Sequence, residues 1–259
     1  MRHPGAIAPL ALLLLNGCQY VSGVAELNIG ADKVAATPWD CLGVGKRDDP
    51  KPRPTVEYVG SVWNISGTSV LADVVLRLCQ TTDESCSAPV LSVASVDSVI
   101  RFTVDSSFAG YVELESPGMM PAVVELSRPI GSMRTLPEFR MLDVFTLELF
   151  ALNMGKRIDA SLGHALYWTE DCSGSRAPGV SVKALGDLTD ETAQYYVVDR
   201  KLPSASVTMT DASGGGGFIN LPITYVTFEA FRADTKQTIS TFPGRIRPGQ
   251  VTFMVVEPD

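Results

Sequence analysis

The sequence predicts an all-β protein made of two tandem antiparallel β-sandwiches with one connecting α-helix. Short segments rich in Val, Ile, Phe and Tyr recur along the chain with turn residues between them, and this pattern is typical of strands. Several segments alternate apolar and polar residues, so one face of each strand is buried and the other is wet. The 259 residues fit one or two domains, and the 45% hydrophobic content excludes a disordered protein.

The N-terminus has the organisation of a secretory signal. A short polar segment, Arg2–His3, precedes an apolar run over Ala6–Leu15. This run of about ten residues is too short to cross roughly 30 Å of hydrocarbon as a helix. It ends at Leu15-Asn16-Gly17-Cys18, which resembles the lipobox of bacterial lipoproteins. The alternative is an ordinary cleaved signal peptide that leaves Cys18 as a stray thiol.

The lipobox resemblance implies a location for the protein. It implies a signal peptide over residues 1–17, cleavage before Cys18, and acylation of Cys18 with diacylglycerol and a further chain such as palmitate. Several acyl chains together anchor a folded domain durably in a membrane. Gln19 is not the aspartate that retains lipoproteins in the inner membrane. The resemblance therefore favours an exported, outer-membrane lipoprotein, on the periplasmic face or at the cell surface.

Four further cysteines remain once the proposed anchor is set aside. An exported compartment permits disulfide bonds, and four cysteines allow three pairings. A short polar segment separates Cys79 from Cys86 and is typical of a tight loop between strands, so local pairing is the simplest expectation. That choice leaves Cys41 to pair with Cys172. The chain has no Cys-x-x-Cys motif and no convergent histidines, so we expect no metal site.

Residues 18–54 are expected to form a lipidated linker. Prolines at every second position from Pro50 to Pro54 favour an extended, solvated spacer. The segment 38–43 interrupts this linker with Trp39 and Cys41, and a bulky aromatic beside a cysteine indicates a segment that docks on a domain.

The strand signals fall into two units, over residues 55–130 and 157–259. Gly163 and Trp168 in the second unit stand about one hundred residues after Gly60 and Trp63, and this repeat spacing equals one small sandwich domain. The strands expected in the first unit are 56–63, 70–79, 90–93, 99–104, 110–115 and 122–126.

Residues 131–156 are predicted to connect the units through a helix over Pro137–Met154. Gly155 is suited to ending that helix in a left-handed conformation. The apolar stripe is expected to pack over a sheet edge or core, because the polar face carries charges of both signs and is not the basic face of a membrane-surface helix. Its members recur at spacings of three and four: Phe139, Leu142, Phe145, Leu149 and Leu152.

The second unit, over about residues 158–257, carries five motifs in a fixed order: Asp171-Cys172-Ser173-Gly174, Gly179-Val180-Ser181-Val182, Thr210-Asp211-Ala212-Ser213-Gly214, Phe218-Ile219-Asn220-Leu221-Pro222, and Val251-Thr252-Phe253-Met254-Val255 after Arg247-Pro248-Gly249. Together they resemble the carboxypeptidase regulatory-like family of transthyretin-like (prealbumin-like, Ig-like) β-sandwiches. The first unit matches it more loosely. The resemblance implies an accessory or cell-surface domain with no catalytic apparatus.

Composition and motifs exclude several functions. The formal charge of −8 argues against nucleic acid, whose binding needs clustered Lys and Arg. After signal removal His164 is the one histidine, and it stands in an apolar strand where a structural role is expected. No Gly-x-Ser-x-Gly elbow is present, and Gly214–Gly217 lacks the Lys of a phosphate loop, which favours a flexible hairpin tip. We therefore expect no enzyme activity, no catalytic residue and no cofactor.

Candidate binding residues are aromatic. Trp63 and Trp168 occupy equivalent repeat positions and are expected in the cores. Tyr195 and Tyr196 are consecutive, so on a strand they face opposite sides, and one exposed ring is the candidate ligand surface. Lys183 and Asn220 stand on expected strands and raise the question of an intramolecular isopeptide bond, although no buried acid can be assigned beside them.

The sequence therefore predicts a non-catalytic lipoprotein of the cell envelope that acts as a binding or structural module. Its expected partners are the membrane, through the N-terminal lipid, and carbohydrate, peptidoglycan or another envelope protein. The alternative is an accessory subunit of an envelope hydrolase or transport complex, with catalysis in another chain.

Overall fold

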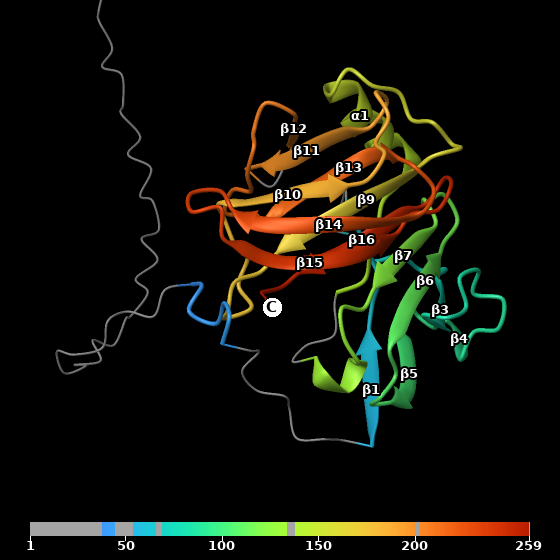
Figure 1. The fold of residues 1–259 in the computed structure, drawn as a ribbon. Coiled ribbons are helices and arrows are strands. Elements are labelled where there is room, and N and C mark those ends of the chain that lie inside the picture. Colours follow the sequence, from blue (N-terminus) through green and yellow to red (C-terminus); the bar gives the residue numbers. More distant parts are fainter. Residues whose placement is uncertain (1–37, 45–53, 66–68, 134–137, 200–201, 259) are drawn as a thin grey trace, which may run out of the picture. The chain divides into compact units, whose positions relative to one another are not determined.

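The computed structural model describes residues 38–44, 54–65, 69–133, 138–199 and 202–258 (Figure 1). The expected signal peptide, Cys18 and much of the linker lie outside these residues. Strands dominate the described part, so the all-β prediction is confirmed. Its elements are β1 (Thr55–Gly60), β2 (Trp63–Asn64), β3 (Val75–Gln80), β4 (Leu91–Ala94), β5 (Ile100–Asp105), β6 (Gly110–Glu115), β7 (Ala122–Glu125), the 3₁₀ turn η1 (Ile130–Ser132), β8 (Arg140–Met141), α1 (Val144–Asn153), β9 (Gly163–Thr169), β10 (Val180–Leu185), β11 (Ala193–Val198), β12 (Leu202–Ser204), β13 (Gly215–Leu221), β14 (Tyr225–Arg232), β15 (Thr238–Arg245) and β16 (Val251–Val256).

The largest element of the fold is a nine-stranded sheet with the order β12-β11-β13-β9-β16-β7-β6-β3-β4. Strands of both predicted units belong to it. The C-terminal strand β16 joins them, because it pairs in parallel with β7 on one side and with β9 on the other. Val251 is the register partner of both Ala122 and His164. The other pairings in this sheet are antiparallel.

The half of this sheet around β9 is covered on both faces. Leu166 of β9 belongs to a core that also contains Leu147 of α1 and Phe102 of β5. Its neighbour Tyr167 points the other way, into a second core with Phe228 of β14. That second core lies beneath the three-stranded sheet β10-β14-β15, which forms the front layer in Figure 1. Double coverage explains why β9 and β16 are almost continuously buried, as strands with two dry faces are.

The glycine run Gly214–Gly217 differs from its prediction. Gly215–Gly217 lies inside β13, a strand within the nine-stranded sheet, so the expectation of a flexible hairpin tip is wrong. A Cβ on Gly216 would collide with the ring of Tyr167, and one on Gly217 would collide with the hydroxyl end of Tyr195. These glycines are therefore required because two tyrosine rings cross the strand closely on its opposite faces.

Helix α1 is shorter than predicted and is turned the other way. Arg140–Met141 pairs with β2 as strand β8, and α1 starts only at Val144, where the Asp143 side chain caps the backbone N–H of Thr146 at 2.8 Å. The prediction that the apolar stripe is buried is wrong for the residues that lie in the helix. Phe145, Leu149 and Leu152 are 67%, 43% and 63% exposed.

A second, interleaved apolar set faces the core instead. Leu147 and Ala151 are buried, and Phe150 and Met154 pack against the same core half-buried. These residues also recur at spacings of three and four, so periodicity alone does not distinguish the two faces. Phe139 and Leu142, which precede the helix, are buried as predicted.

Both predicted disulfides are present. Cys41 pairs with Cys172 at a Cα–Cα distance of 5.7 Å, and Cys79 pairs with Cys86 at 5.3 Å. The first bond holds residues 38–44 against the C-terminal half, where Trp39 and Leu42 pack on the second core. The prediction of a docked aromatic segment is therefore confirmed.

The two disulfides should differ in their effect on stability. In the chain-entropy model, a bond that closes a loop across 131 residues stabilises by about 5 kcal/mol, and one across 7 residues by about 2.5 kcal/mol. We therefore expect Cys41→Ser/Cys172→Ser to lose about twice as much free energy of unfolding as Cys79→Ser/Cys86→Ser. Chemical denaturation of the two oxidised variants measures this difference. Equal losses would contradict it.

The close approach at Gly217 predicts a rescue. Gly217→Ala should destabilise the protein by about 1–3 kcal/mol, because its Cβ would overpack the sheet against both the Ala165 carbonyl oxygen and the end of the Tyr195 ring. Tyr195→Phe removes the clashing hydroxyl, which is buried without a hydrogen-bond partner among the described residues. We expect the double variant to recover part of the loss in a thermal or denaturant melt. A loss in the double variant equal to the sum of the single ones would show that the two residues do not interact.

Candidate binding groove

An open groove with a volume of about 570 Å³ lies where β3 and β4 meet the β6–β7 turn. Strand β4 is the terminal strand of the nine-stranded sheet, so the groove borders a sheet edge. The turn is also joined to the start of α1 through a bridge between Met119 and Asp143. The groove is lined by Asp73, Val74, Val75, Ala94, Ser95, Glu115, Ser116, Pro117, Met119 and Pro121.

The polar side chains of the lining are two carboxylates and two hydroxyls. Among the described residues, no His, Cys or Lys lines the groove. The Ser95 hydroxyl is already engaged, since it accepts from the backbone N–H of Val74 at 3.0 Å and donates to the Ala72 carbonyl. The remaining polar groups are the carboxylates of Asp73 and Glu115 and one further hydroxyl, on Ser116. The groove therefore offers apolar contact and negative charge.

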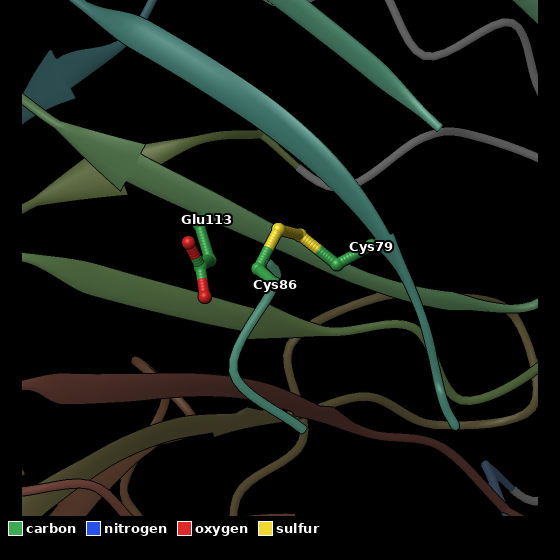
Figure 2. A group of neighbouring side chains, drawn as sticks. All are labelled: Cys79, Cys86 and Glu113. Atoms are coloured by element: carbon green, nitrogen blue, oxygen red, sulfur yellow. A yellow bond between two sulfur atoms is a disulfide. The ribbon is translucent and has the colours of Figure 1, made fainter. Parts of the chain in front are cut away.

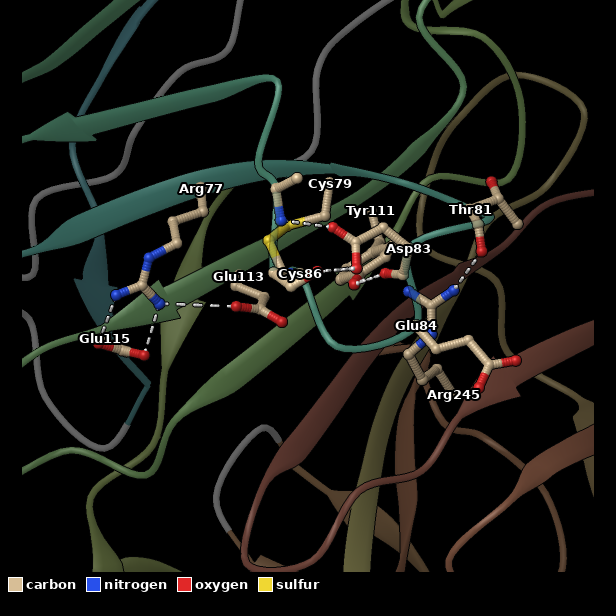
Figure 3. The surroundings of a disulfide bond; sticks show 12 residues. Arg77, Cys79, Thr81, Asp83, Glu84, Cys86, Tyr111, Glu113, Glu115 and Arg245 are labelled. Atoms are coloured by element: carbon tan, nitrogen blue, oxygen red, sulfur yellow. Dashed lines mark hydrogen bonds and ion pairs between the residues drawn. A yellow bond between two sulfur atoms is a disulfide. The ribbon is translucent and has the colours of Figure 1, made fainter.

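Glu115 is held in place by Arg77. The guanidinium of Arg77 donates to both carboxylate oxygens, at 2.6 and 3.1 Å, and lies 3.6 Å from Glu113 (Figure 3). The hydrogen bond to Glu115 is the main reason that the pKa of Arg77 is raised. This fork geometry fixes the carboxylate at the groove wall.

Two arginines of the C-terminal half contact residues of the N-terminal half around Tyr111. Arg247 is ion-paired with Glu113 and donates to the Tyr111 hydroxyl at 2.8 Å. Arg245, which is almost fully buried, stacks 3.6 Å from the centre of the Tyr111 ring and also donates to the hydroxyl of Tyr225 at 2.6 Å. These cation–π and charge-assisted contacts tie the two halves together on the disulfide side of the sheet.

A half-buried carboxylate faces the same arginines. Glu125 accepts a hydrogen bond from the backbone N–H of Arg245 at 3.1 Å. Burial raises its pKa, and the charges of Arg245 and Arg247 offset part of that rise. Among the described residues, Glu115 is the member of this network that lines the groove, and Arg77 and Glu113 connect it to Arg247.

One group of three side chains meets the distance requirement of a metal site. Ligand atoms of Cys79, Cys86 and Glu113 lie within 4.8 Å of one another (Figure 2). However, the two sulfurs are bonded to each other, and Glu113 is ion-paired with Arg247. The trio therefore offers no thiolate to a metal ion, and zinc sites depend on that ligand.

The predicted tyrosine surface is wrong. Tyr195 and Tyr196 do face opposite sides of β11, but each points into one of the two cores and both are buried. The Tyr196 hydroxyl accepts from the backbone N–H of Val182 at 3.2 Å and from the Gln194 amide at 2.8 Å. Desolvation raises the pKa of Tyr195. The sequence signal that predicts such burial is a run of consecutive apolar residues, because a strand covered on both faces has no polar side to alternate with.

The remaining candidates have structural positions. Trp63 and Trp168 are half-buried in different sheets, in β2 and β9. Lys183 is exposed on β10, with its amino group 4.7 Å from the centre of the Phe231 ring. The Asn220 amide is instead buried and donates to the Arg157 carbonyl at 2.7 Å. Lys183 and Asn220 are therefore not brought together for an isopeptide bond.

His164 is fully buried in β9, as a structural histidine would be. Its Nδ1 accepts from the backbone N–H of Asn220 at 3.2 Å, while Nε2 has no partner among the described residues. Burial lowers its pKa to about 4, and the nearby carboxylate of Asp159 offsets this only in part. A neutral imidazole without access to solvent does not serve as a general base.

Comparisons with known proteins assign no family to this chain. No protein-family model matches it, and neither does any curated protein. Among solved structures it is similar to the Bacillus anthracis TIE protein, with 12% identity, a TM-score of 0.24, and coverage of 79% of this chain and 34% of that one. The chain thus spans about a third of that protein's length.

Two pilins show the same degree of similarity. A streptococcal ancillary pilin has 12% identity and a TM-score of 0.24, with 78% of this chain and 68% of the pilin covered. The shaft pilin SpaA from Lactobacillus rhamnosus GG has 9% identity and a TM-score of 0.24, with 80% and 98% covered. Such low values carry no functional assignment. No helix among the described residues has the length and apolar character needed to span a membrane.

The buried imidazole predicts a pH dependence. Because its pKa is about 4 in the folded state and 6.5 when unfolded, stability is full above pH 6.5 and falls as the pH drops from 6.5 to 4. Between pH 7 and pH 4.5, protonation of His164 in the unfolded chain should lower the free energy of unfolding by about 2–3 kcal/mol. His164→Asn keeps an acceptor near the Nδ1 position and does not titrate. We expect the variant to lose less stability than the wild type over this range in denaturant titrations, and identical losses would refute the assignment.

Proposed function

We propose that this chain is a non-catalytic, lipid-anchored module of the bacterial cell envelope that binds an extended segment of another envelope protein in the groove. The observation that carries the proposal is a groove with apolar and acidic walls, without a nucleophile–base pair, at the edge of a large sheet. The lipobox-like segment ending at Cys18 supports the anchor, and the two disulfides support an exported location.

The sheet edge favours a peptide as the ligand. An edge strand presents unpaired backbone N–H and C=O groups, and an extended peptide adds to such an edge through main-chain hydrogen bonds. Ala94 of β4 lines the groove, so a peptide along β4 would also contact its floor. Among the described residues no aromatic side chain lines the groove, which favours a peptide over the stacked sugar rings of a glycan.

The groove charge indicates what such a peptide carries. Asp73 and Glu115 are both exposed on the rim. The charge of Glu115 is largely balanced by Arg77, whereas in the described part of the chain no cationic side chain lines the groove beside Asp73. We therefore expect a segment with a small apolar side chain and a Lys or Arg near Asp73.

Site-specific photocrosslinking in cells tests this function. A photoreactive residue in place of Ser116, inside the groove, should capture one envelope protein, and the same residue in place of Leu185, an exposed position on β10, should not. Asp73→Lys should reduce the groove adduct several-fold, because it reverses the rim charge. Equal adducts at both positions, or none at the groove, would contradict the proposal. Capture of a hydrolase or transport component would identify the chain as an accessory subunit.

The anchor is tested separately by fractionation. Wild-type chain should partition with membranes and carry an acylated N-terminal Cys18, whereas Cys18→Ala should be released into the soluble fraction. Intact-mass measurement of the purified chain checks the acylation. A soluble wild-type protein would refute the anchor without affecting the groove.

A further inference from the structure

Helix α1 presents an apolar face that nothing in the described residues covers. Phe145 and Leu152 are about two-thirds exposed, and Val144 and Leu149 are nearly half exposed. Four of the large exposed hydrophobic residues thus stand on one ten-residue helix. A helix that is apolar on its core side and also on its solvent side is unusual on a free surface, and such patches mark interaction sites.

The geometry of the helix separates these two faces clearly. Leu147 and Ala151 face the core, and Phe150 lies 5.6 Å from Tyr195 between ring centres. Phe145, Leu149 and Leu152 lie on the other side at i, i+4 and i+7, one continuous stripe along the helix. The Asp143 cap and the packing of the inner face hold this stripe in place, so it is presented outward without any change in the fold.

We infer that this face inserts into the headgroup boundary of the bilayer to which the chain is anchored. The inference rests on the proposed lipid anchor at Cys18. Residues 19–37 separate Cys18 from the first described residue, Pro38, and a chain of that length reaches at most about 65 Å. The tether therefore keeps the folded domain close to the bilayer, and the effective concentration of lipid at the helix is high. A small apolar patch is then enough to keep the domain on the bilayer surface.

The size and charge of the face favour a lipid surface over a protein. A ten-residue helix is about 15 Å long, and one stripe on it is far smaller than the roughly 800 Å² per partner of a stable dimer. Lipid needs no complementary shape. Glu148 is the one charged residue of the helix and it is exposed, so a zwitterionic headgroup layer suits this face better than an anionic one. At about 15 Å the helix lies along the boundary and does not cross it.

Hydrogen exchange of the tethered chain tests this inference. The chain from residue 18 onward is coupled through its Cys18 thiol to a maleimide lipid in vesicles of phosphatidylethanolamine and phosphatidylcholine, the other four cysteines being paired. Amides of α1 should exchange at least threefold more slowly on the vesicle than in free solution. Because the coupling is chemical, this result does not depend on acylation in the cell, which the fractionation experiment tests.

Matched variants identify the surface responsible. Phe145→Ser/Leu152→Ser should abolish the slowing while the chain stays on the vesicle, since both side chains are exposed and the inner face is untouched. Val59→Ser replaces an aliphatic residue on β1 that is about half exposed, and it should change nothing. Strand β1 lies at the opposite end of the view from α1 in Figure 1. Unchanged exchange of α1 on vesicles would overturn the inference. Concentration-dependent slowing without vesicles would also overturn it, and would assign the face to a second copy of the chain.

Discussion

The parallel pairing of β16 with both β7 and β9 is the constraint on which the rest of the structure depends. The last strand of the chain thereby lies between elements from opposite halves, and without it the nine-stranded sheet would divide into two. This strand also contributes to both hydrophobic cores: Phe253 packs in the core that contains Leu147 of α1, and Met254 packs in the core beneath the three-stranded sheet. Because these contacts are distant in sequence, the sheet forms only after the C-terminal residues are available.

The arginines just before β16 reinforce that junction. Arg245 and Arg247 leave the three-stranded layer and end against Tyr111 and Glu113 of the other half. Buried guanidinium groups are costly unless they are bonded, so this network favours one arrangement of the halves over alternatives. It also backs the wall of the groove through Arg77 and Glu115. Glu115 at the proposed binding groove is therefore connected by ion pairs to this junction of the two halves.

How far the sequence predicts the structure differs between features. Strand content, the Cys79–Cys86 bond and the docked Trp39 segment followed from local pattern, since alternation, turn residues and close cysteine spacing act over short distances. The Cys41–Cys172 bond followed only by elimination. The face of α1 did not, because Phe145 and Leu147 belong to two equally regular apolar stripes. The burial of Tyr195 did not either, since an exposed and a covered sheet face differ only in what packs on them. The groove was missed because Asp73, Ala94 and Glu115 are distant in sequence and carry no motif.

The sequence by itself determined the class of fold and indicated the local Cys79–Cys86 bond, since both depend on residue types or short spacings. Only the tertiary structure decided that both halves share one sheet and that Gly216 and Gly217 make room for tyrosine rings. It also decided that the side of α1 that carries Leu152 is exposed. The physical reason is the same in each case. Burial is a property of the partner surface, and the partner surface is assembled by strands far apart in the chain, above all by β16.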